Sequence, residues 1–249
     1  MRKDSGLFWW TVLITVMLGV ATFCWFFSIY VFAHPEKPFA YRLLTKLEKI
    51  EPPQKFSALT VPTGQFLTPK EAYGKFYAFD DRYLEIDNSL LKRHYLTNYK
   101  EEAPLYMRGL FRIFQVRRLT DADAFTAGVV VRARSHDYPN VVVEYLFPSD
   151  QAPERPESLL SIGDDLTLDK TSTFASVIHI EKLRDDNLCF TLVPLVYGSY
   201  EVADVGKISL SPPQRLNLEA PWPVTDESIQ QPDSPETEVT MTLSGTEGS

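Results

Sequence analysis

The chain has 249 residues, of which 44% are hydrophobic and 23% are charged, and its formal net charge is −8. This composition excludes a fully disordered chain and a fibrous repeat. Two cysteines are too few for a disulfide framework or a cysteine-rich zinc module. Residues 216–249 hold seven acidic residues and no Lys or Arg. The remaining chain is therefore nearly neutral, which disfavours nucleic acid as a partner.

The first element expected is a transmembrane helix at residues 7–33, after a short flank at residues 1–6. The segment has no charged side chain. A helix of this length measures about 40 Å, enough to cross a bilayer core of about 30 Å. Trp10 and Tyr30 stand near its two ends, as expected for residues that prefer the membrane interfaces. We therefore predict that residues 7–33 contact the lipid bilayer as a single-pass signal anchor.

Two features of this anchor stay open. Val31-Phe32-Ala33 resembles a signal-peptidase site, although the apolar stretch exceeds the usual ~7–15 residues of a signal peptide, which favours an uncleaved helix. Arg2 and Lys3 precede the span, yet more basic residues follow it. Because a large domain follows one N-terminal span, we expect a bacterial inner-membrane protein with its C-terminal domain exported, and the reverse orientation is the alternative.

Residues 34–55 are predicted to form a juxtamembrane helix and a linker. Pro35 and Pro38 break the membrane helix. Apolar residues then recur at helical spacing over 39–50, which predicts a short amphipathic helix. Its apolar and basic faces fit either the bilayer surface or packing on the domain. Residues 51–67 have the character of an extended linker.

Residues 56–220 are predicted to form one soluble domain. Thr68-Pro69-Lys70-Glu71 has the pattern of a capping box, which predicts a helix that runs to about Phe79. A second helix is predicted at 88–99. After Glu102 the hydrophobic pattern has a period of two, which is typical of strands. The strand candidates are 106–119, 125–134, 141–147, 166–168, 174–183, 188–196, 200–205 and 207–210.

The predicted fold class is therefore α+β, mainly β, with one transmembrane helix, short helices and a β-rich domain of about seven strands. A small barrel or a sandwich is the economical way to close such a sheet. Residues 221–249 are rich in Ser, Thr, Glu and Pro, which predicts a disordered acidic tail.

The sequence lacks the usual signatures of catalysis or cofactor binding. It contains no Gly-x-Ser-x-Gly motif and no glycine-rich phosphate loop. His179 and Glu181 share a strand face, but two residues are too few to indicate a metal site. Cys189 alternates with apolar neighbours, which favours a buried, inert thiol. We expect no catalytic residues, no metal and no cofactor, and a protein that is not an enzyme.

One face of the membrane helix carries small residues: Thr11, Thr15, Gly19 and Thr22. Such a stripe lets a second helix approach closely, and it predicts a helix–helix interface. Ordinary membrane composition is the alternative interpretation.

Four arginines form the candidate ligand site: Arg108, Arg112, Arg132 and Arg134. Each pair has the even spacing that places side chains on one face of a strand. If the two strands pair, the four guanidinium groups form one patch for carboxylates or phosphates. A solvated sheet face with cross-strand salt bridges is the alternative.

These observations rank three functions. The first is a single-pass membrane-anchored envelope protein whose exported β-rich domain acts as a scaffold or protein-interaction module, with an envelope protein or a second copy as its partner. The second is a binding module for an anionic envelope ligand, a glycan or a lipid headgroup, through the arginines. An envelope hydrolase ranks last: paired carboxylates leave no motif, so it stays a candidate, but no feature of the sequence supports it.

Overall fold

The computed structural model describes residues 5–35, 37–47, 56–57, 59–99, 103–120, 123, 125, 127–149, 160–169, 174–196, 198–202 and 206–210. The described helices are α1 (Ser5–Ala33), α2 (Pro38–Lys46), α3 (Pro69–Phe76) and α4 (Asp81–Leu96). The described strands are β1 (Gln65–Leu67), β2 (Leu105–Met107), β3 (Gly109–Arg118), β4 (Gly128–Ser135), β5 (Val141–Pro148), β6 (Asp165–Leu168), β7 (Ala175–Lys182), β8 (Leu188–Pro194), β9 (Gly198–Val202) and β10 (Gly206–Leu210). The predicted tail at 221–249 lies outside these residues.

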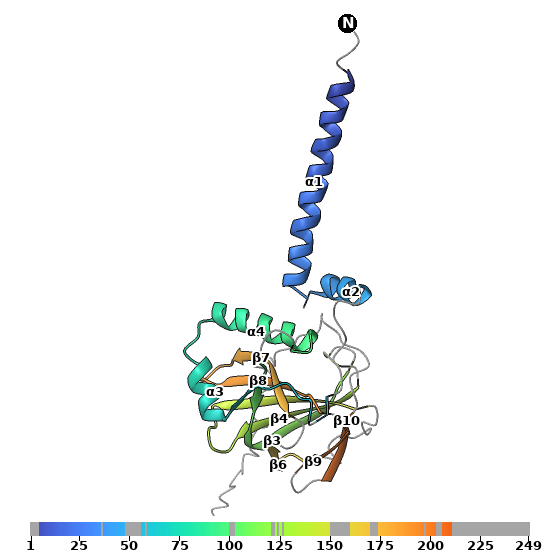
Figure 1. The fold of residues 1–249 in the computed structure, drawn as a ribbon. Coiled ribbons are helices and arrows are strands. Elements are labelled where there is room, and N and C mark those ends of the chain that lie inside the picture. Colours follow the sequence, from blue (N-terminus) through green and yellow to red (C-terminus); the bar gives the residue numbers. More distant parts are fainter. Residues whose placement is uncertain are drawn as a thin grey trace, which may run out of the picture.

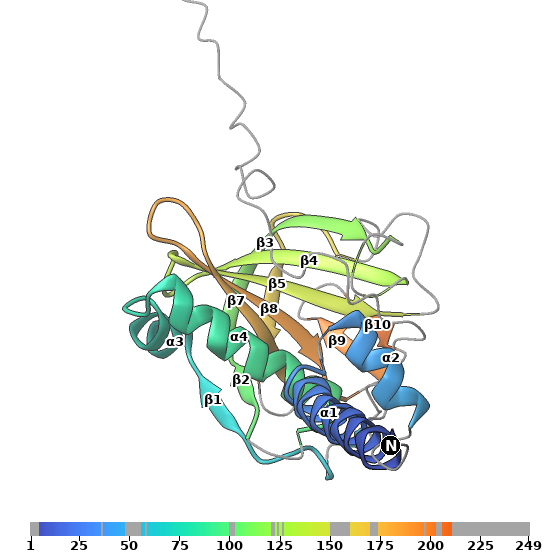
Figure 2. The same cartoon turned by 90° about the horizontal axis from the view of Figure 1, so that it is seen from above.

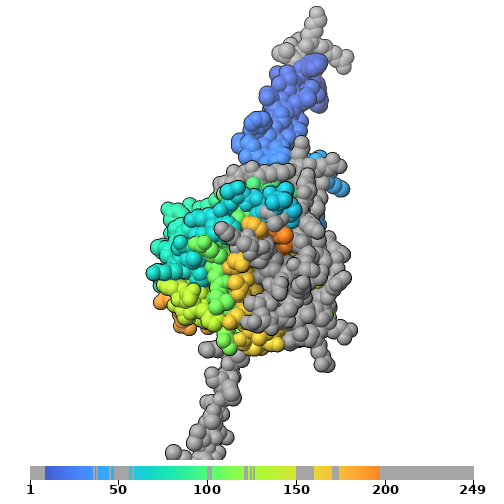
Figure 3. Space-filling model, turned by 60° about the horizontal axis from the view of Figure 1, so that its bottom comes forward, coloured from blue at the N-terminus to red at the C-terminus, as the bar shows by residue number. Residues whose placement is uncertain are grey.

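Helix α1 projects away from the rest of the protein (Figures 1 and 3). All side chains from Trp9 to Phe26 are exposed, including five large aromatic ones. The helix predicted at 7–33 is thus present. Its apolar window, Trp9–Ala33, is long enough to cross a membrane, and an N-terminal signal sequence would have the same properties.

Local capping explains where α3 and α4 begin. The Thr68 hydroxyl accepts a hydrogen bond from the Glu71 backbone, and the Glu71 carboxylate accepts one from the Thr68 backbone at 2.8 Å, which is the capping box predicted from the sequence. Helix α4 begins at Asp81, earlier than the predicted Asn88, because the Asp80 carboxylate caps it by accepting from the Tyr83 backbone at 2.9 Å.

The main sheet has eight strands in the order β1-β2-β7-β8-β5-β4-β3-β6. It is mixed: β1–β2 and β5–β8 are parallel and the other pairs are antiparallel. The sheet curls into a half-barrel (Figures 1 and 2), so the prediction of about seven strands closed as a barrel or a sandwich is corrected. Strands β9 and β10 form a separate antiparallel pair.

Two differences from the predicted strands have local causes. The candidate at 106–119 is divided into β2 and β3 at Gly109, whose φ of 149° is one that side-chain-bearing residues rarely adopt. Strand β1 falls in the predicted linker, because three residues are too short to show alternation.

Two hairpins form the centre of the sheet. Strand β4 pairs with β5, and β7 pairs with β8 through a turn in which Asp185 and Asp186 have positive φ. Both hairpins agree with the predicted strands. The parallel pairing of β5 with β8 joins them, so these two strands lie inside the sheet and are buried along their whole length.

The two faces of the sheet differ. One carries the main apolar core, to which β5 contributes Val143 and Tyr145, α3 contributes Phe76, and α4 contributes Leu84. The other face has a smaller apolar cluster around Leu146 at one end and a small one formed by Val142 and Cys189 at the other. Polar side chains separate these two clusters.

Candidate functional site

A row of polar side chains crosses the second face of the sheet. Its members are Gln115 on β3, Arg132 on β4, Glu144 on β5, Thr191 on β8 and His179 on β7. Each is the direct cross-strand neighbour of the next. We call these five residues the polar row. They are far apart in the sequence, and only the strand order brings them together.

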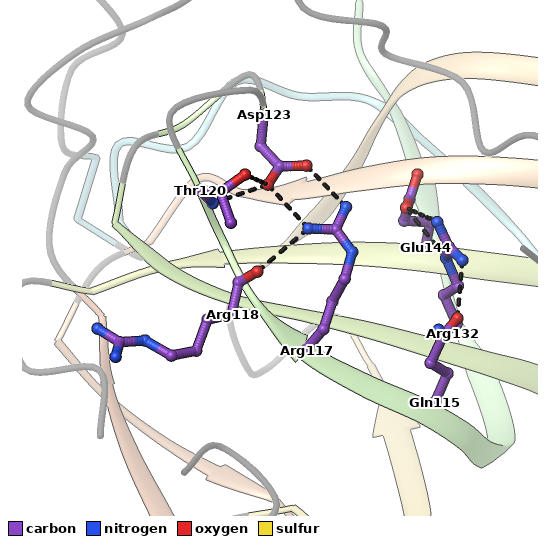
Figure 4. A network of polar contacts seen from close by, with 7 residues as sticks. All are labelled: Gln115, Arg117, Arg118, Thr120, Asp123, Arg132 and Glu144. Atoms are coloured by element: carbon purple, nitrogen blue, oxygen red, sulfur yellow. Dashed lines mark hydrogen bonds and ion pairs between the residues drawn. The ribbon is translucent and has the colours of Figure 1, made fainter. Parts of the chain in front are cut away.

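The centre of the polar row is a buried ion pair (Figure 4). The Nε and Nη2 atoms of Arg132 donate to Glu144 Oε1 at 3.2 and 3.0 Å, and Arg132 Nη1 donates to Gln115 Oε1 at 2.7 Å. The two charged side chains are only 6% and 5% exposed. Burial raises the pKa of Glu144, and the neighbouring Arg132 charge opposes this rise. The geometry thus pairs the buried Arg132 guanidinium with the Glu144 carboxylate.

A second ion pair lies at the end of β3, nearer the surface. Arg117 Nη1 and Nη2 donate to the two carboxylate oxygens of Asp123 at 2.8 and 2.7 Å, and the Thr120 backbone donates to the same carboxylate at 2.7 Å (Figure 4). The side chains of Arg117 and Asp123 are 37% and 16% exposed. Burial alone would raise the pKa of Asp123, but the hydrogen bonds from Arg117 and Thr120 lower it. This pair ties the end of β3 to the segment that follows.

The four predicted arginines have different surroundings. Arg112 and Arg134 are direct neighbours on β3 and β4, as the predicted strand pairing requires. Arg112 is exposed, whereas Arg134 is partly buried and donates to the Pro139 carbonyl at 2.9 Å. Arg132 follows on the same face of β4, but it is buried against Glu144. Arg108 is exposed before β3 begins, and its backbone donates to the Leu67 carbonyl.

The predicted small-residue stripe lies on the exposed surface of α1. The hydroxyls of Thr15 and Thr22 each donate to the backbone carbonyl four residues earlier, at 2.8 Å. A Cβ placed on Gly19 would meet no atom within 4 Å. These positions have room for a neighbouring helix, and their role as an interface stays a prediction, as does that of Thr11.

Asn88 is a structural residue that the sequence analysis missed. Its side-chain amide donates to the Ile180 carbonyl at 2.8 Å and accepts from the Ile180 backbone at 2.7 Å. In this way α4 supplies β7 with the hydrogen bonds that a neighbouring strand would otherwise make. The contact depends on the packing of α4 against β7, so no local pattern in the sequence indicates it.

A surface cavity of about 510 Å³ lies beside this contact. It is lined by Lys37, Asp81, Leu84, Glu85, Asn88, Ser89, Lys92, His179, Ile180, Glu181 and Lys182. Burial, aided by the charge of Lys92, lowers the pKa of His179 to about 3, so its ring is neutral at physiological pH. In the described part of the chain, His179 Nδ1 has no hydrogen-bond partner.

The described residues contain no group of three or more His, Cys, Asp or Glu side chains placed to hold a metal ion. Burial raises the pKa of the Cys189 thiol, which keeps it protonated. No protein-family model matches the chain, and no curated protein or solved structure is significantly similar to it. Within the polar row, Gln115, Arg132 and Glu144 are hydrogen-bonded to one another, which favours a structural role for these three residues.

Proposed function

We propose that this chain is a single-pass membrane protein of the bacterial cell envelope, whose exported β-rich domain acts as a scaffold or protein-interaction module. The membrane helix is α1, used as an uncleaved signal anchor with its N-terminus in the cytoplasm. The domain from α3 onward then lies outside the inner membrane, close to its surface.

The observation that carries this proposal is the exposure of α1. Its residues are apolar, yet the window from Trp9 to Ala33 makes almost no contact with the domain. In water such a surface would be strongly unfavourable, because each Å² of exposed apolar area costs about 25 cal/mol. A bilayer removes this cost, and Trp10 and Tyr30 stand where its two interfaces would lie.

An exposed stripe on α4 supports the interaction role. Tyr83 and Ile86, one turn apart, are both exposed, and Tyr83 is in ring contact with Phe79. Aromatic residues are enriched in the cores of protein interfaces. Helix α4 lies on the side of the domain nearest α1 (Figure 1), so a partner docked on this stripe would be a membrane-bound or membrane-proximal protein.

The membrane part is tested with a C-terminal alkaline phosphatase fusion and the mass of the membrane-bound chain. We expect an active fusion and a full-length product in carbonate-washed membranes. An inactive fusion on a stable chain would reverse the orientation. A soluble product that begins at His34 would show that the segment is a cleaved signal peptide.

The interaction part is tested by placing a photo-cross-linking amino acid at Ile86 in living cells. We expect a discrete adduct with one protein, and loss of that adduct when Tyr83→Ser is added. Glu85, which is exposed but points about 100° around α4 from Ile86, is the control position. Equal adducts from 85 and 86, or none from either, would contradict the proposal. An adduct of the chain with itself would identify a second copy as the partner.

A binding module for an anionic ligand is the second candidate, favoured by the adjacent Arg112 and Arg134. Its site would be these two residues, because Arg132 is already paired with Glu144. The variant Arg112→Gln/Arg134→Gln should then elute from a heparin resin at lower salt than the unmodified protein. Arg82→Gln, which removes an exposed arginine on α4, is the control and should elute as the unmodified protein does.

A further inference from the structure

Helix α2 packs against α1 with only part of its apolar surface. Ala40 and Leu44 are buried in a cluster with Val31 of α1. The ring of Phe39 also meets that of Phe27 of α1 in an edge-on contact, with ring centroids 5.9 Å apart. The sequence left open whether α2 packs on the domain or lies on the bilayer surface. In the structure the buried residues of α2 face α1.

The contacts also fix the level at which α2 lies along α1. Phe27 and Val31 belong to the last two turns of α1, which ends at Ala33. Tyr30 lies between them, and Trp25 lies just before them. Trp and Tyr mark the interface at the end of a membrane span. Helix α2 therefore lies beside the end of α1 and turns away from its axis at the level of this aromatic belt (Figures 1 and 2).

Part of the apolar surface of α2 stays exposed, although Leu43 also packs partly against the cluster with Val31. Phe39, Leu43 and Leu47 follow one another at intervals of four residues and so share one side of the helix. Phe39 is 61% exposed and Leu47 is 56% exposed. Arg42 and Lys46 flank this side, and with Phe39 and Leu43 they line a mostly apolar hollow of about 570 Å³.

We propose that α2 is an interfacial helix that lies in the plane of the membrane, with Phe39, Leu43 and Leu47 inserted among the lipids. Arg42 and Lys46 extend to the lipid phosphates, as long basic side chains do at membrane surfaces. The lipid surface of α1 then continues without interruption onto α2. This inference rests on the proposed membrane anchor, and it adds a second contact that sets the height of the domain above the bilayer.

The test uses the full-length protein in vesicles of phosphatidylcholine and phosphatidylglycerol. Single spin labels are attached at Phe39→Cys and at Leu47→Cys in a Cys24→Ser background. Cys189 is left in place because it is buried, and the background without an added cysteine is the labelling blank. Collisions with oxygen, which concentrates in lipid, are compared with collisions with a water-soluble nickel chelate.

Two reference positions make the result decisive. Leu18→Cys reports the middle of α1. Ile162→Cys lies in the turn before β6, a strand on the side of the domain away from α1 (Figure 1). Ile162 has the same 61% exposure as Phe39. We expect the labels at 39 and 47 to meet oxygen more often than nickel, as the label at 18 does, and the label at 162 to show the reverse.

The two possible failures are distinguishable. If the labels at 39 and 47 behave like the label at 162 while the label at 18 stays in lipid, the interfacial helix is wrong and the membrane anchor stands. If the label at 18 also meets the nickel chelate freely, the anchor is wrong and the interfacial helix falls with it.

Discussion

Val143 and Glu144 are consecutive residues of β5, and both are buried, but they face opposite sides of the sheet. Val143 lies in the main apolar core, with Ala133 of β4 and Phe190 of β8 as its cross-strand neighbours. Glu144 lies in the polar row, where its charge depends on Arg132. The stability of the apolar face depends on close packing without cavities. The stability of the polar face depends on keeping the two charges of the ion pair together. The same strand is therefore stabilised by two kinds of interaction with different sensitivities.

The largest effect is expected from breaking the buried pair on the polar face. Glu144→Gln keeps the shape of the side chain but leaves the Arg132 charge buried without its counter-charge. We expect the free energy of unfolding to fall by about 3–5 kcal/mol, measured by urea unfolding of the full-length protein in detergent.

A double variant sharpens this comparison. Arg132→Met/Glu144→Leu converts the centre of the polar row into an apolar pair of similar size. We expect it to be more stable than Glu144→Gln alone, because no unpaired buried charge remains. A double variant as unstable as the single one would show that the ion pair itself contributes most of the stability of this face.

On the apolar face the matched variant is Val143→Ala, one residue away. It leaves a small cavity and removes two methyl groups from the core, so we expect a loss of about 2 kcal/mol in the same urea assay. A loss as large as that of Glu144→Gln would show that the two faces are equally sensitive to substitution, contrary to this prediction.

Because of His179, at the end of the polar row, we expect the free energy of unfolding to depend on pH. Its pKa is lowered to about 3 in the folded protein, against about 6.5 in an unfolded chain. Below pH 6.5 the unfolded state binds a proton that the folded state does not, so stability should fall as the pH falls. Between pH 7 and pH 5 we expect a loss of at most about 2 kcal/mol from this group.

The control for this effect is His179→Gln, which cannot take up the proton. Urea unfolding at pH 7 and pH 5 should show a smaller loss in this variant than in the unmodified protein. The charged groups that line the same cavity are Lys37, Asp81, Glu85, Lys92, Glu181 and Lys182, and both proteins share them. Equal losses in the two proteins would assign the pH dependence to these groups instead.

The smallest effect is expected from the ion pair between Arg117 and Asp123. It has better hydrogen-bond geometry than the buried pair but is more exposed, so water can replace the lost partner. Asp123→Asn should lower the free energy of unfolding by about 1 kcal/mol or less, in the same assay. A loss that matches Glu144→Gln would mean that burial does not decide the cost of breaking a pair in this sheet.

Elements whose cause is local could be predicted from the sequence. The apolar helix at 7–33 follows from its length without a charge, and the start of α3 follows from four consecutive residues. The four strands of the two central hairpins agree with the candidates predicted at 125–134, 141–147, 174–183 and 188–196. The Asp80 cap and the three-residue β1 were missed, because one cap residue and one short strand give too weak a pattern.

Less of the candidate site than of the fold could be predicted from the sequence. The even spacing placed Arg108 with Arg112 and Arg132 with Arg134, whereas the neighbouring of Arg112 and Arg134 comes from the pairing of β3 with β4. The burial of Arg132 was not predictable, because it depends on Glu144 lying directly across from it. The full four-residue patch and the helix–helix stripe on α1 stay predictions that no described contact tests.

The sequence by itself determined the apolar N-terminal helix, the capped start of α3 and the strands of the two central hairpins, since each depends on residues close together in the chain. Only the tertiary structure decided the strand order, and above all the parallel pairing of β5 with β8. That pairing joins residues more than forty positions apart, such as Glu144 and Thr191, and so creates the polar row. Contacts between distant segments leave no periodic pattern in either one, and their stability comes from the burial that the completed sheet provides.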